Sequence, residues 1–337
     1  MMDYLNYRSS PKPKVSIIVP TFNAERHIGE TLASLLVQDD CDLEILVMDD
    51  GSTDATVEYV RAIDDRRIRL HVNDVNLGLP ANMNLGMSLA RGQYLARMDH
   101  DDYAMEHRFA RQARFLDENR DVTVVGGQIR HFGLDESESN FPLDDGRIKA
   151  RFVSGEEYLA NPTAMWRADF VRKNLIAYDA NLYVVDDLGV WFDCMLSGAR
   201  FANLSEVVLR YRIHSGMTSM RLSPDRLFRS KQRIYKRLLP VYFPRLDGPA
   251  CDALISAYRF GLDEKTDIEQ LRAFHQAAAL ALSEVSSAFG QDVEEVKVAL
   301  LHVVNRRRRL LFEGGGITSH QMNYLDDLFR KALLRNV

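Results

Sequence analysis

The stretch Val15-Ser16-Ile17-Ile18-Val19-Pro20-Thr21-Phe22-Asn23 begins with a nearly continuous run of β-branched residues and then reaches a proline. A run of this kind is typical of a central strand that is buried on both faces. Pro20 should end the strand, and Asn23 can cap the helix that follows. Apolar residues recur on one face of that helix, at Ile28, Leu32, Leu35 and Leu36.

Strands and helices alternate beyond this first strand. Residues 43–48 form a second apolar run, and the polar turn 49–54 after it can cap a helix. Residues 68–72 predict a third strand, and a helix over 81–90 follows the loop Asn76-Leu77-Gly78. This alternation implies an α/β fold with a mainly parallel sheet and helices on both faces, in which ligands bind at the carboxyl ends of the strands.

Three carboxylates end the next strand. Gly92 introduces a short apolar run that leads into Ala96-Arg97-Met98-Asp99-His100-Asp101-Asp102. Along a strand, residues two apart point the same way, so Asp99 and Asp101 could aim at one point. Carboxylates are hard ligands that suit Mg²⁺ or Mn²⁺, ions that also bind substrate phosphates. We therefore expect a site for a metal ion and a diphosphate at this edge of the sheet.

An Asp-x-Asp triplet alone is a weak signal in a chain with 48 acidic residues, and Asp40-Cys41-Asp42, with the same spacing, is expected to be a solvated turn. No Gly-x-Gly-x-x-Gly follows the first strand, and the chain has no Gly-x-x-x-x-Gly-Lys-Ser/Thr. Neither Asp49 nor Asp99 starts an EF-hand, because the twelfth position holds Val60 or Ala110 instead of Glu.

The next hundred residues continue the alternation. They predict a helix over 108–119, strands over 122–129, 161–167 and 207–212, a polar loop over 131–147 and an apolar helix over 188–196. Asp186-Asp187 precedes the apolar helix, and His214 follows the last strand. Taken alone, the two carboxylates are expected to be partners of the helix dipole, and the histidine an ordinary surface or core residue.

Helical periodicity takes over beyond residue 223. A helical appendage is expected, with helices over 227–242, 250–260, 268–289, 293–312 and 319–334. Residues 221–245 hold eight basic residues and one acidic residue, although the net charge of the chain is −5. The apolar stripe of this segment is expected to pack onto the α/β domain that precedes it. The alternative is peripheral contact of this segment with an anionic membrane near a lipid-linked acceptor. Binding of nucleic acid is not expected, because the sequence shows no base-stacking platform.

The composition is that of a soluble globular protein. The 337 residues are 46% hydrophobic and 27% charged, which suits one large or two ordinary domains. No run approaches the roughly 18 apolar residues of a membrane span, and residues 1–13 are polar. Cys41, Cys194 and Cys251 are scattered, without metal-ligand or redox spacing. These features predict a cytoplasmic protein with no zinc site.

Several of these motifs, in this order and at these intervals, resemble those of the family 2 inverting glycosyltransferases of the GT-A fold. They are Pro20-Thr21-Phe22-Asn23, Met48-Asp49-Asp50-Gly51-Ser52-Thr53-Asp54, Asn76-Leu77-Gly78 and Ala96-Arg97-Met98-Asp99-His100-Asp101-Asp102. The similarity continues over residues 13–219 through Asn161-Pro162-Thr163-Ala164-Met165-Trp166-Arg167, Asp186-Asp187 with Trp191, and Tyr211-Arg212-Ile213-His214.

The resemblance implies a GT-A (Rossmann-like) catalytic domain over 14–220, with a nucleotide-binding half at 14–103 and an acceptor half at 104–220. A flexible N-terminus over 1–13 would precede it, and a helical region over 221–337 would follow it. The implied activity is transfer of a sugar from a nucleotide-sugar, most commonly a UDP-sugar, to a hydroxyl of a glycan or lipid-linked acceptor. Family members of this type serve bacterial polysaccharide and cell-envelope assembly, in the cytoplasm or peripherally at the inner face of the plasma membrane.

The resemblance also assigns residues to the donor side of the site. The nucleotide would be held by Pro20, Phe22, Asp50, Asn76 and Asp99. A Mn²⁺ or Mg²⁺ ion would be held by Asp101, Asp99 and His214. Such an ion would offset the charge that develops on the departing nucleoside diphosphate.

On the acceptor side, the attacking hydroxyl has a high pKa and needs a carboxylate to take its proton. The resemblance assigns this role to Asp187, and a direct displacement of this kind inverts the anomeric carbon. The acceptor would also meet Asp186, Trp166 and Trp191.

Three positions depart from the commoner family pattern. Asp186 stands where Glu is usual, Gly189 where an acid is frequent and Met83 where an arginine is common. Two other classes of function stay open: a non-catalytic nucleotide-sugar or glycan-binding module, and a nucleotidyltransferase with a similar sheet. An intact set of metal and base residues disfavours the first. The second would show a glycine-rich, basic loop after the first strand.

Overall fold

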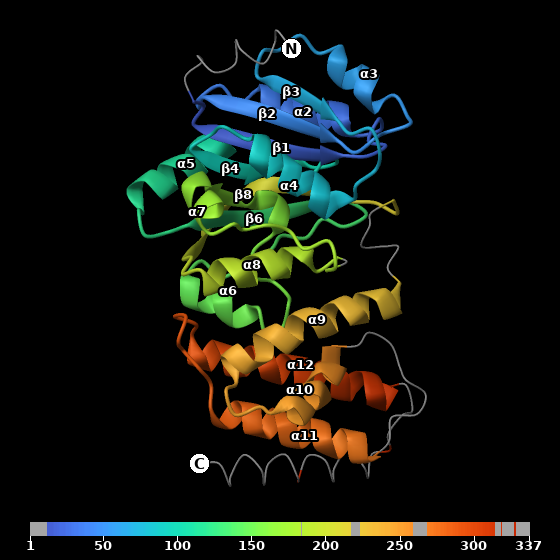
Figure 1. The fold of residues 1–337 in the computed structure, drawn as a ribbon, viewed down its shortest axis with the longest axis vertical. Helices are drawn as coiled ribbons and strands as arrows, with labels where there is room; N and C mark the ends of the chain where they lie inside the picture. The colour runs from blue at the N-terminus through green and yellow to red at the C-terminus, as the bar shows by residue number, and fades with distance from the viewer. Residues whose placement is uncertain are drawn as a thin grey trace. The chain divides into compact units, whose positions relative to one another are not determined.

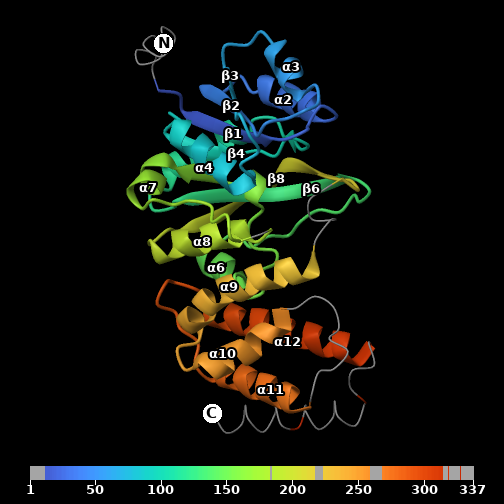
Figure 2. The same ribbon diagram turned by 45° about the vertical axis from the view of Figure 1, so that its right-hand side comes forward.

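The computed structural model describes residues 12–182, 184–216, 223–258, 268–313, 318 and 327 (Figure 1; Figure 2). Their contacts define two compact units, each assembled from separate segments. The first unit holds the residues up to Leu143, Leu159–Ala180 and Ala199–His214. The second holds Asp144–Tyr158, Asn181–Gly198 and the residues from Ser215 onward. The predicted domain boundary near residue 220 remains a prediction.

The first unit is built on an eight-stranded sheet. Its strands are β1 (Val15–Thr21), β2 (Leu43–Asp49), β3 (Ile68–Val72), β4 (Tyr94–Arg97), β5 (Tyr103–Ala104), β6 (Val124–Gly133), β7 (Met165–Arg167) and β8 (Phe201–Ile213). They lie in the order β3-β2-β1-β4-β7-β6-β8-β5, and only β7 and β5 pair antiparallel with their neighbours in this sheet. The predicted α/β fold with a mainly parallel sheet is confirmed.

Helices are distributed over both units. The first unit contains α2 (Ile28–Leu36), α3 (Thr56–Arg61), α4 (Leu79–Leu89), α5 (Arg108–Glu118), the 3₁₀ turn η2 (Asn161–Thr163) and α7 (Ala168–Lys173). The second contains α6 (Asp145–Arg151), α8 (Asp186–Leu196), α9 (Pro224–Tyr242), α10 (Gly248–Ile255), η4 (Ser256–Tyr258), α11 (Ile268–Ser283) and α12 (Val293–Glu313). In the described part of the chain, no helix is long and apolar enough to cross a membrane.

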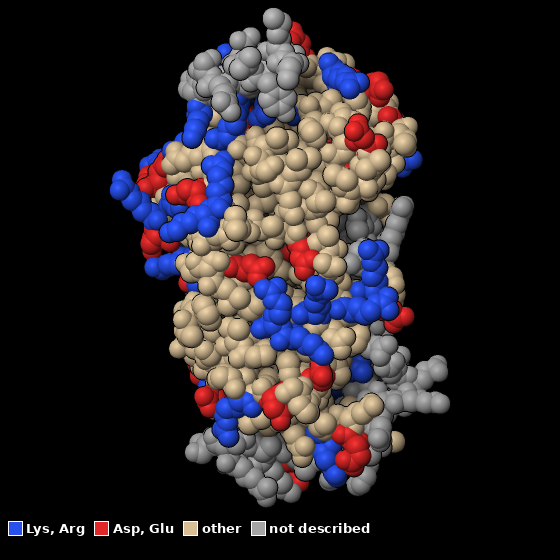
Figure 3. All heavy atoms as spheres, in the orientation of Figure 1, with Lys and Arg blue, Asp and Glu red and all other residues tan. Residues whose placement is uncertain are grey.

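The basic segment forms α9, whose apolar face is buried within the second unit. That face consists of Leu227, Ile234, Tyr235, Leu238, Leu239 and Tyr242. The hydroxyl of Tyr242 donates a hydrogen bond to the carbonyl oxygen of Lys149 at 2.6 Å. The expected packing of the stripe is therefore confirmed. Figure 3 shows Lys and Arg side chains gathered over the other face of α9, and membrane contact through 221–245 remains a prediction.

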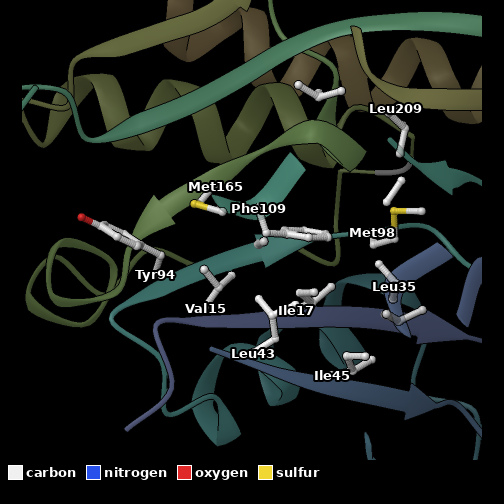
Figure 4. Close-up of a cluster of buried hydrophobic side chains, with 14 of the residues drawn as sticks. Val15, Ile17, Leu35, Leu43, Ile45, Tyr94, Met98, Phe109, Met165 and Leu209 are labelled. Atoms are coloured by element: carbon white, nitrogen blue, oxygen red, sulfur yellow. The ribbon is translucent and has the colours of Figure 1, made fainter. Parts of the chain in front are cut away.

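Alternate residues of β1 pack on opposite faces of the sheet. Val15 and Ile17 lie in one apolar cluster with Leu35 of α2 and Phe109 of α5 (Figure 4). Ile18 points the other way, toward α4, where a Cβ on Gly86 would lie only 2.7 Å from its Cγ2 atom. Helices thus cover both faces of β1, which explains why its sequence is continuously apolar instead of alternating.

A buried cation joins the centre of the sheet to α5. Arg108 is fully buried, and its Nη2 atom donates hydrogen bonds to the carbonyl oxygens of Arg97 (2.9 Å) and Pro162 (2.6 Å). Its Nε atom donates to Gln112, whose amide donates in turn to the carbonyl oxygen of Thr163 at 2.7 Å. Burial lowers the pKa of Arg108 to about 9, which still leaves the guanidinium charged at neutral pH. Arg108 thus ties α5 to the end of β4 and to η2.

Several local predictions need correction. β1 continues through Pro20 to Thr21, because β4 stops pairing at Ile18 and leaves no strand opposite the missing N–H of the proline. Asn23 does not cap α2, whose N-cap is His27. Residues 161–163 form η2 before the short strand β7, and β6 and α6 shorten the polar loop predicted over 131–147. The helix predicted over 319–334 lies outside the described residues, apart from Asp327.

We expect the substitution Arg108→Met to lower the free energy of unfolding by about 3 kcal/mol, because it leaves buried carbonyl oxygens without a donor. Urea denaturation followed by circular dichroism measures this change. Arg114→Met is the matched control on the same helix, since Arg114 is exposed and its side chain pairs with Glu118. Equal stability of the two variants would contradict the role given to Arg108.

Candidate active site

Asp50, at the end of β2, holds the loop that follows β3. Its Oδ1 atom accepts hydrogen bonds from the side chain of Asn73 (2.9 Å) and the N–H of Leu77 (2.8 Å). Its Oδ2 atom accepts one from the N–H of Gly78 at 2.8 Å, and the residue is only 4% exposed. Asp50 therefore fixes the loop that carries the exposed Asn76, and each of its oxygens is engaged by the protein itself.

A second set of hydrogen bonds joins the ends of β1 and β2. Asp49 accepts hydrogen bonds from the hydroxyls of Thr21 (3.1 Å) and Ser52 (2.6 Å). The side chain of Asn23 accepts one from the N–H of Thr53 at 2.9 Å, and Asn23 adopts a left-handed φ of 50°. These bonds hold the short segment that presents Phe22, whose side chain is 45% exposed. Phe22 follows β1 and the loop held by Asp50 follows β3, with β2 between these two strands in the sheet.

The carboxylate segment 99–102 is a turn, not a continuation of β4. The Thr31 hydroxyl of α2 lies 2.8 Å from the carbonyl oxygens of both His100 and Asp102. The ring nitrogen Nδ1 of His100 lies 3.1 Å from the carbonyl oxygen of Pro20. The turn is thus fastened to both β1 and α2.

Helix α2 and the residues just after it also bind the segment that follows the turn. Ser34 accepts a hydrogen bond from the N–H of Ala104 at 3.0 Å, and Gln38 donates one to the carbonyl oxygen of Met105 at 2.9 Å. Thr31, Ser34 and Gln38 are all buried, at positions i, i+3 and i+7 of the segment. Sequence reasoning missed this stripe, although polar residues on the inward face of an amphipathic helix are a detectable signal.

The turn directs its carboxylates toward different partners. Asp101 Oδ2 lies 3.0 Å from His214 Nε2, across 113 residues of sequence. Asp99 Oδ1 accepts a hydrogen bond from Arg97 Nε at 2.9 Å. The expectation that Asp99 and Asp101 aim at one point rested on an extended strand and remains a prediction. The structure brings Asp101 together with His214.

These residues fit a divalent cation. A carboxylate oxygen and an imidazole nitrogen can both bind Mn²⁺, whereas Mg²⁺ favours oxygen ligands such as the carboxylate. Such an ion often takes only one or two protein ligands and fills the rest of its coordination with water and phosphate. Across the described ranges, no group of three or more His, Cys, Asp or Glu side chains is placed to hold a metal. Substrate oxygens would therefore have to complete the coordination of a cation at Asp101 and His214.

The electrostatics of the turn also favour a cation. Asp102 is 1% exposed, and burial together with the carboxylates of Asp99 and Asp101 raises its pKa well above the ordinary value. Its Oδ1 atom accepts the N–H of Arg212 at 2.9 Å, while Oδ2 has no hydrogen-bond partner among the described residues. Burial, and then the same carboxylates, raise the pKa of Tyr211. The turn is therefore a site of concentrated negative charge.

The second unit holds the remaining carboxylates in the first turn of α8. Asp186 is 8% exposed, whereas Asp187 is half-buried and its Oδ2 atom accepts a hydrogen bond from the hydroxyl of Tyr158 at 3.4 Å. Burial, and then the charge of Asp187, raise the pKa of Tyr158, which keeps its hydroxyl protonated as a donor. Asp187 is thus the more accessible of the two acids. Sequence reasoning did not identify Tyr158.

The structure also explains the departures from the family pattern. A Cβ on Gly189 would lie 2.4 Å from Leu182 Cδ1, so an acidic side chain there would require the Leu182 side chain to move. Met83 is completely buried and cannot replace an arginine that contacts phosphate. Trp166 and Trp191 are also completely buried, so the structure does not support the acceptor contact expected of them.

A mainly parallel α/β sheet with an Asp-x-Asp turn at its carboxyl edge defines the GT-A class of nucleotide-sugar enzyme folds. Residues 16–160 match the model of the family "Glycosyl transferase family 2". The chain is 32% identical over 209 residues to EpsE of Bacillus subtilis, which is provisionally named a glycosyltransferase. The aligned residues cover 59% of this chain and 73% of EpsE. The chain belongs to glycosyl transferase family 2.

Two further proteins to which the chain is similar are also named glycosyltransferases. An uncharacterized glycosyltransferase of Haemophilus influenzae is 29% identical over 227 residues, which is 61% of this chain and 68% of that protein. Poly(ribitol-phosphate) β-N-acetylglucosaminyltransferase TarS of Staphylococcus aureus is 27% identical over 240 residues, 67% of this chain and 40% of that protein.

The fold comparison agrees with the sequence comparison. The crystal structure of residues 1–349 of S. aureus TarS in complex with UDP-GlcNAc superposes with a TM-score of 0.60 at 20% identity. The match covers 95% of this chain and 90% of that one. At this identity the likeness establishes the shared GT-A fold.

We expect Asp50→Ala to release the loop that Asp50 anchors, because three donors lose their acceptor. The local opening free energy should fall by about 2 kcal/mol, so the amides of Leu77 and Gly78 should exchange hydrogen about 30-fold faster. Hydrogen-exchange mass spectrometry of a peptide that covers the loop measures this effect. Asp74→Ala, at an exposed acid of the same loop, should leave exchange unchanged; unchanged exchange in both variants would contradict the anchoring role.

Proposed function

We propose that this glycosyltransferase is an inverting enzyme that moves a sugar from a UDP-sugar to a hydroxyl of a glycan acceptor, with a divalent cation bound at Asp101 and His214. The observation that carries the proposal is the 3.0 Å approach of Asp101 Oδ2 to His214 Nε2, beside a turn that already concentrates negative charge. TarS, a relative that transfers N-acetylglucosamine to poly(ribitol-phosphate), supports both the donor and the polymeric acceptor.

On the donor side, Phe22 would stack on the base, while Pro20 and the loop that carries Asn76 would enclose the base and the ribose. Asp50 would act mainly by shaping this loop, since its oxygens already accept three hydrogen bonds from it. Asp99, held by Arg97, would face the ribose and the cation. The cation, when bound, would offset charge on the diphosphate oxygens.

On the acceptor side, Asp187 would accept the proton of the attacking hydroxyl. The acceptor oxygen would form a bond to the anomeric carbon as the bond from that carbon to the diphosphate oxygen breaks, which inverts the centre. The hydrogen bond from Tyr158 would orient the carboxylate of Asp187. Because Asp187 is only half-buried, it is open to a substrate. The acceptor that we propose is a glycan or a lipid-linked saccharide, in bacterial envelope or polysaccharide assembly.

We expect Asp187→Asn to lower the rate of sugar transfer by about 10³-fold, because a general base typically contributes 10²–10⁴-fold. The slow release of UDP from UDP-sugars in water measures this step before the acceptor is known, since water then takes the place of the hydroxyl. Asp193→Asn, on the same helix but paired with Arg237, is the matched control and should retain the wild-type rate.

GDP-sugars and dTDP-sugars in the same assay identify the donor class. If a nucleotide-sugar binds but wild-type protein releases no nucleotide from it, even with Mn²⁺, the transferase proposal is wrong. A non-catalytic nucleotide-sugar-binding module would then account for the site.

A further inference from the structure

Arg212, the residue before the last one of β8, contacts two residues of the carboxylate turn and one residue of α2. Its N–H donates to Asp102 Oδ1 at 2.9 Å, and its Nε atom donates to the carbonyl oxygen of Asp101 at 2.8 Å. Its Nη2 atom donates to Glu30 Oε2 of α2 at 2.6 Å. One residue therefore joins the carboxylate turn, the strand that leads to His214, and the helix that supports the turn.

The surroundings of Arg212 fix its side chain in this position. The side chain is only 16% exposed, and its guanidinium lies over the ring of Phe132, with Cζ 4.5 Å from the ring centroid. The planar guanidinium has donors in several fixed directions, which allows it to contact Asp101 and Glu30 at once. A lysine could not reproduce these two contacts from one rigid plane.

The position of Arg212 in the chain gives these contacts a consequence for the metal site. Asp101 belongs to the turn after β4, whereas His214 follows β8 two residues beyond Arg212. The turn and the end of β8 can separate only if the hydrogen bonds of Arg212 to Asp101 and Asp102 break. Because metal affinity depends on ligand separation, a group that fixes this separation acts on the ion without touching it.

We propose that Arg212 is a positioning residue that holds Asp101 and His214 at the separation needed to bind a divalent cation, and that Glu30 fixes its outer end. The inference rests on the proposed function, because it concerns the proposed metal site. Arg212 itself contacts no substrate or ion in this account. Its role is to keep the two ligands from separate strands within 3.0 Å of each other.

The test compares Mn²⁺ binding by wild-type protein and Arg212→Lys, titrated with MnCl₂ at saturating UDP and followed by the electron paramagnetic resonance of free Mn²⁺. Loss of a group that orients metal ligands typically costs 10–100-fold in metal affinity, and we expect a loss in that range. Binding of UDP without metal should not change.

Arg210→Lys is the matched control. Arg210 also lies on β8 and over the Phe132 ring, at 4.6 Å, and no described contact joins it to the turn. The Arg210→Lys variant should bind Mn²⁺ as tightly as the wild type does. Glu30→Gln keeps the shape of the side chain that pairs with Arg212 but removes its charge, and should weaken Mn²⁺ binding by several-fold. If Arg212→Lys does not fold, Mn²⁺ binding by Glu30→Gln tests the proposal instead.

Three results would overturn the inference. The first is that Arg212→Lys or Glu30→Gln binds Mn²⁺ as tightly as the wild type. The second is that Arg210→Lys loses as much Mn²⁺ affinity as Arg212→Lys. The third is that Arg212→Lys loses as much affinity for UDP without metal as it loses for Mn²⁺. Failure of the proposed function is distinguishable, because the wild-type protein itself would then take up no Mn²⁺ in the presence of UDP.

Discussion

The structure of the first unit depends on how it compensates the negative charge of the turn 99–102. Three carboxylates lie within four residues, and one of them, Asp102, is almost completely buried. Burial, and then the charges of Asp99 and Asp101, raise the pKa of Asp102. The compensating guanidinium groups come from β4, α5 and β8, on Arg97, Arg108 and Arg212.

This arrangement explains why the supporting scaffold is polar where a core is usually apolar. The turn cannot make regular sheet hydrogen bonds, so its carbonyl groups are satisfied by Thr31 of α2 and by Arg212. Buried polar networks of this kind stabilise one geometry, because a partly satisfied network is costly. The rigidity of the turn is therefore a property of α2 and β8 as much as of its own sequence.

Much of the fold was predictable from local patterns, and much of the site was not. The continuous apolar run 15–19 predicts a central parallel strand, and the alternation that follows predicts the sheet. Local patterns did not predict the inward orientation of Asp50, which depends on a partner 23 residues away. The approach of Asp101 to His214, 113 residues away, was expected only from the family resemblance. The burial of Trp166 and Trp191 likewise depends on packing, which a family resemblance does not reveal.

The central claim is that Asp101 supports metal-dependent binding of a nucleoside diphosphate. Calorimetric titration of UDP into the wild-type protein and Asp101→Ala, each with and without Mn²⁺, tests it most directly. We expect Mn²⁺ to strengthen UDP binding to the wild type and to have no such effect on Asp101→Ala, which should keep the weak metal-free affinity. Equal enhancement by Mn²⁺ in both proteins, or none in the wild type, would contradict it.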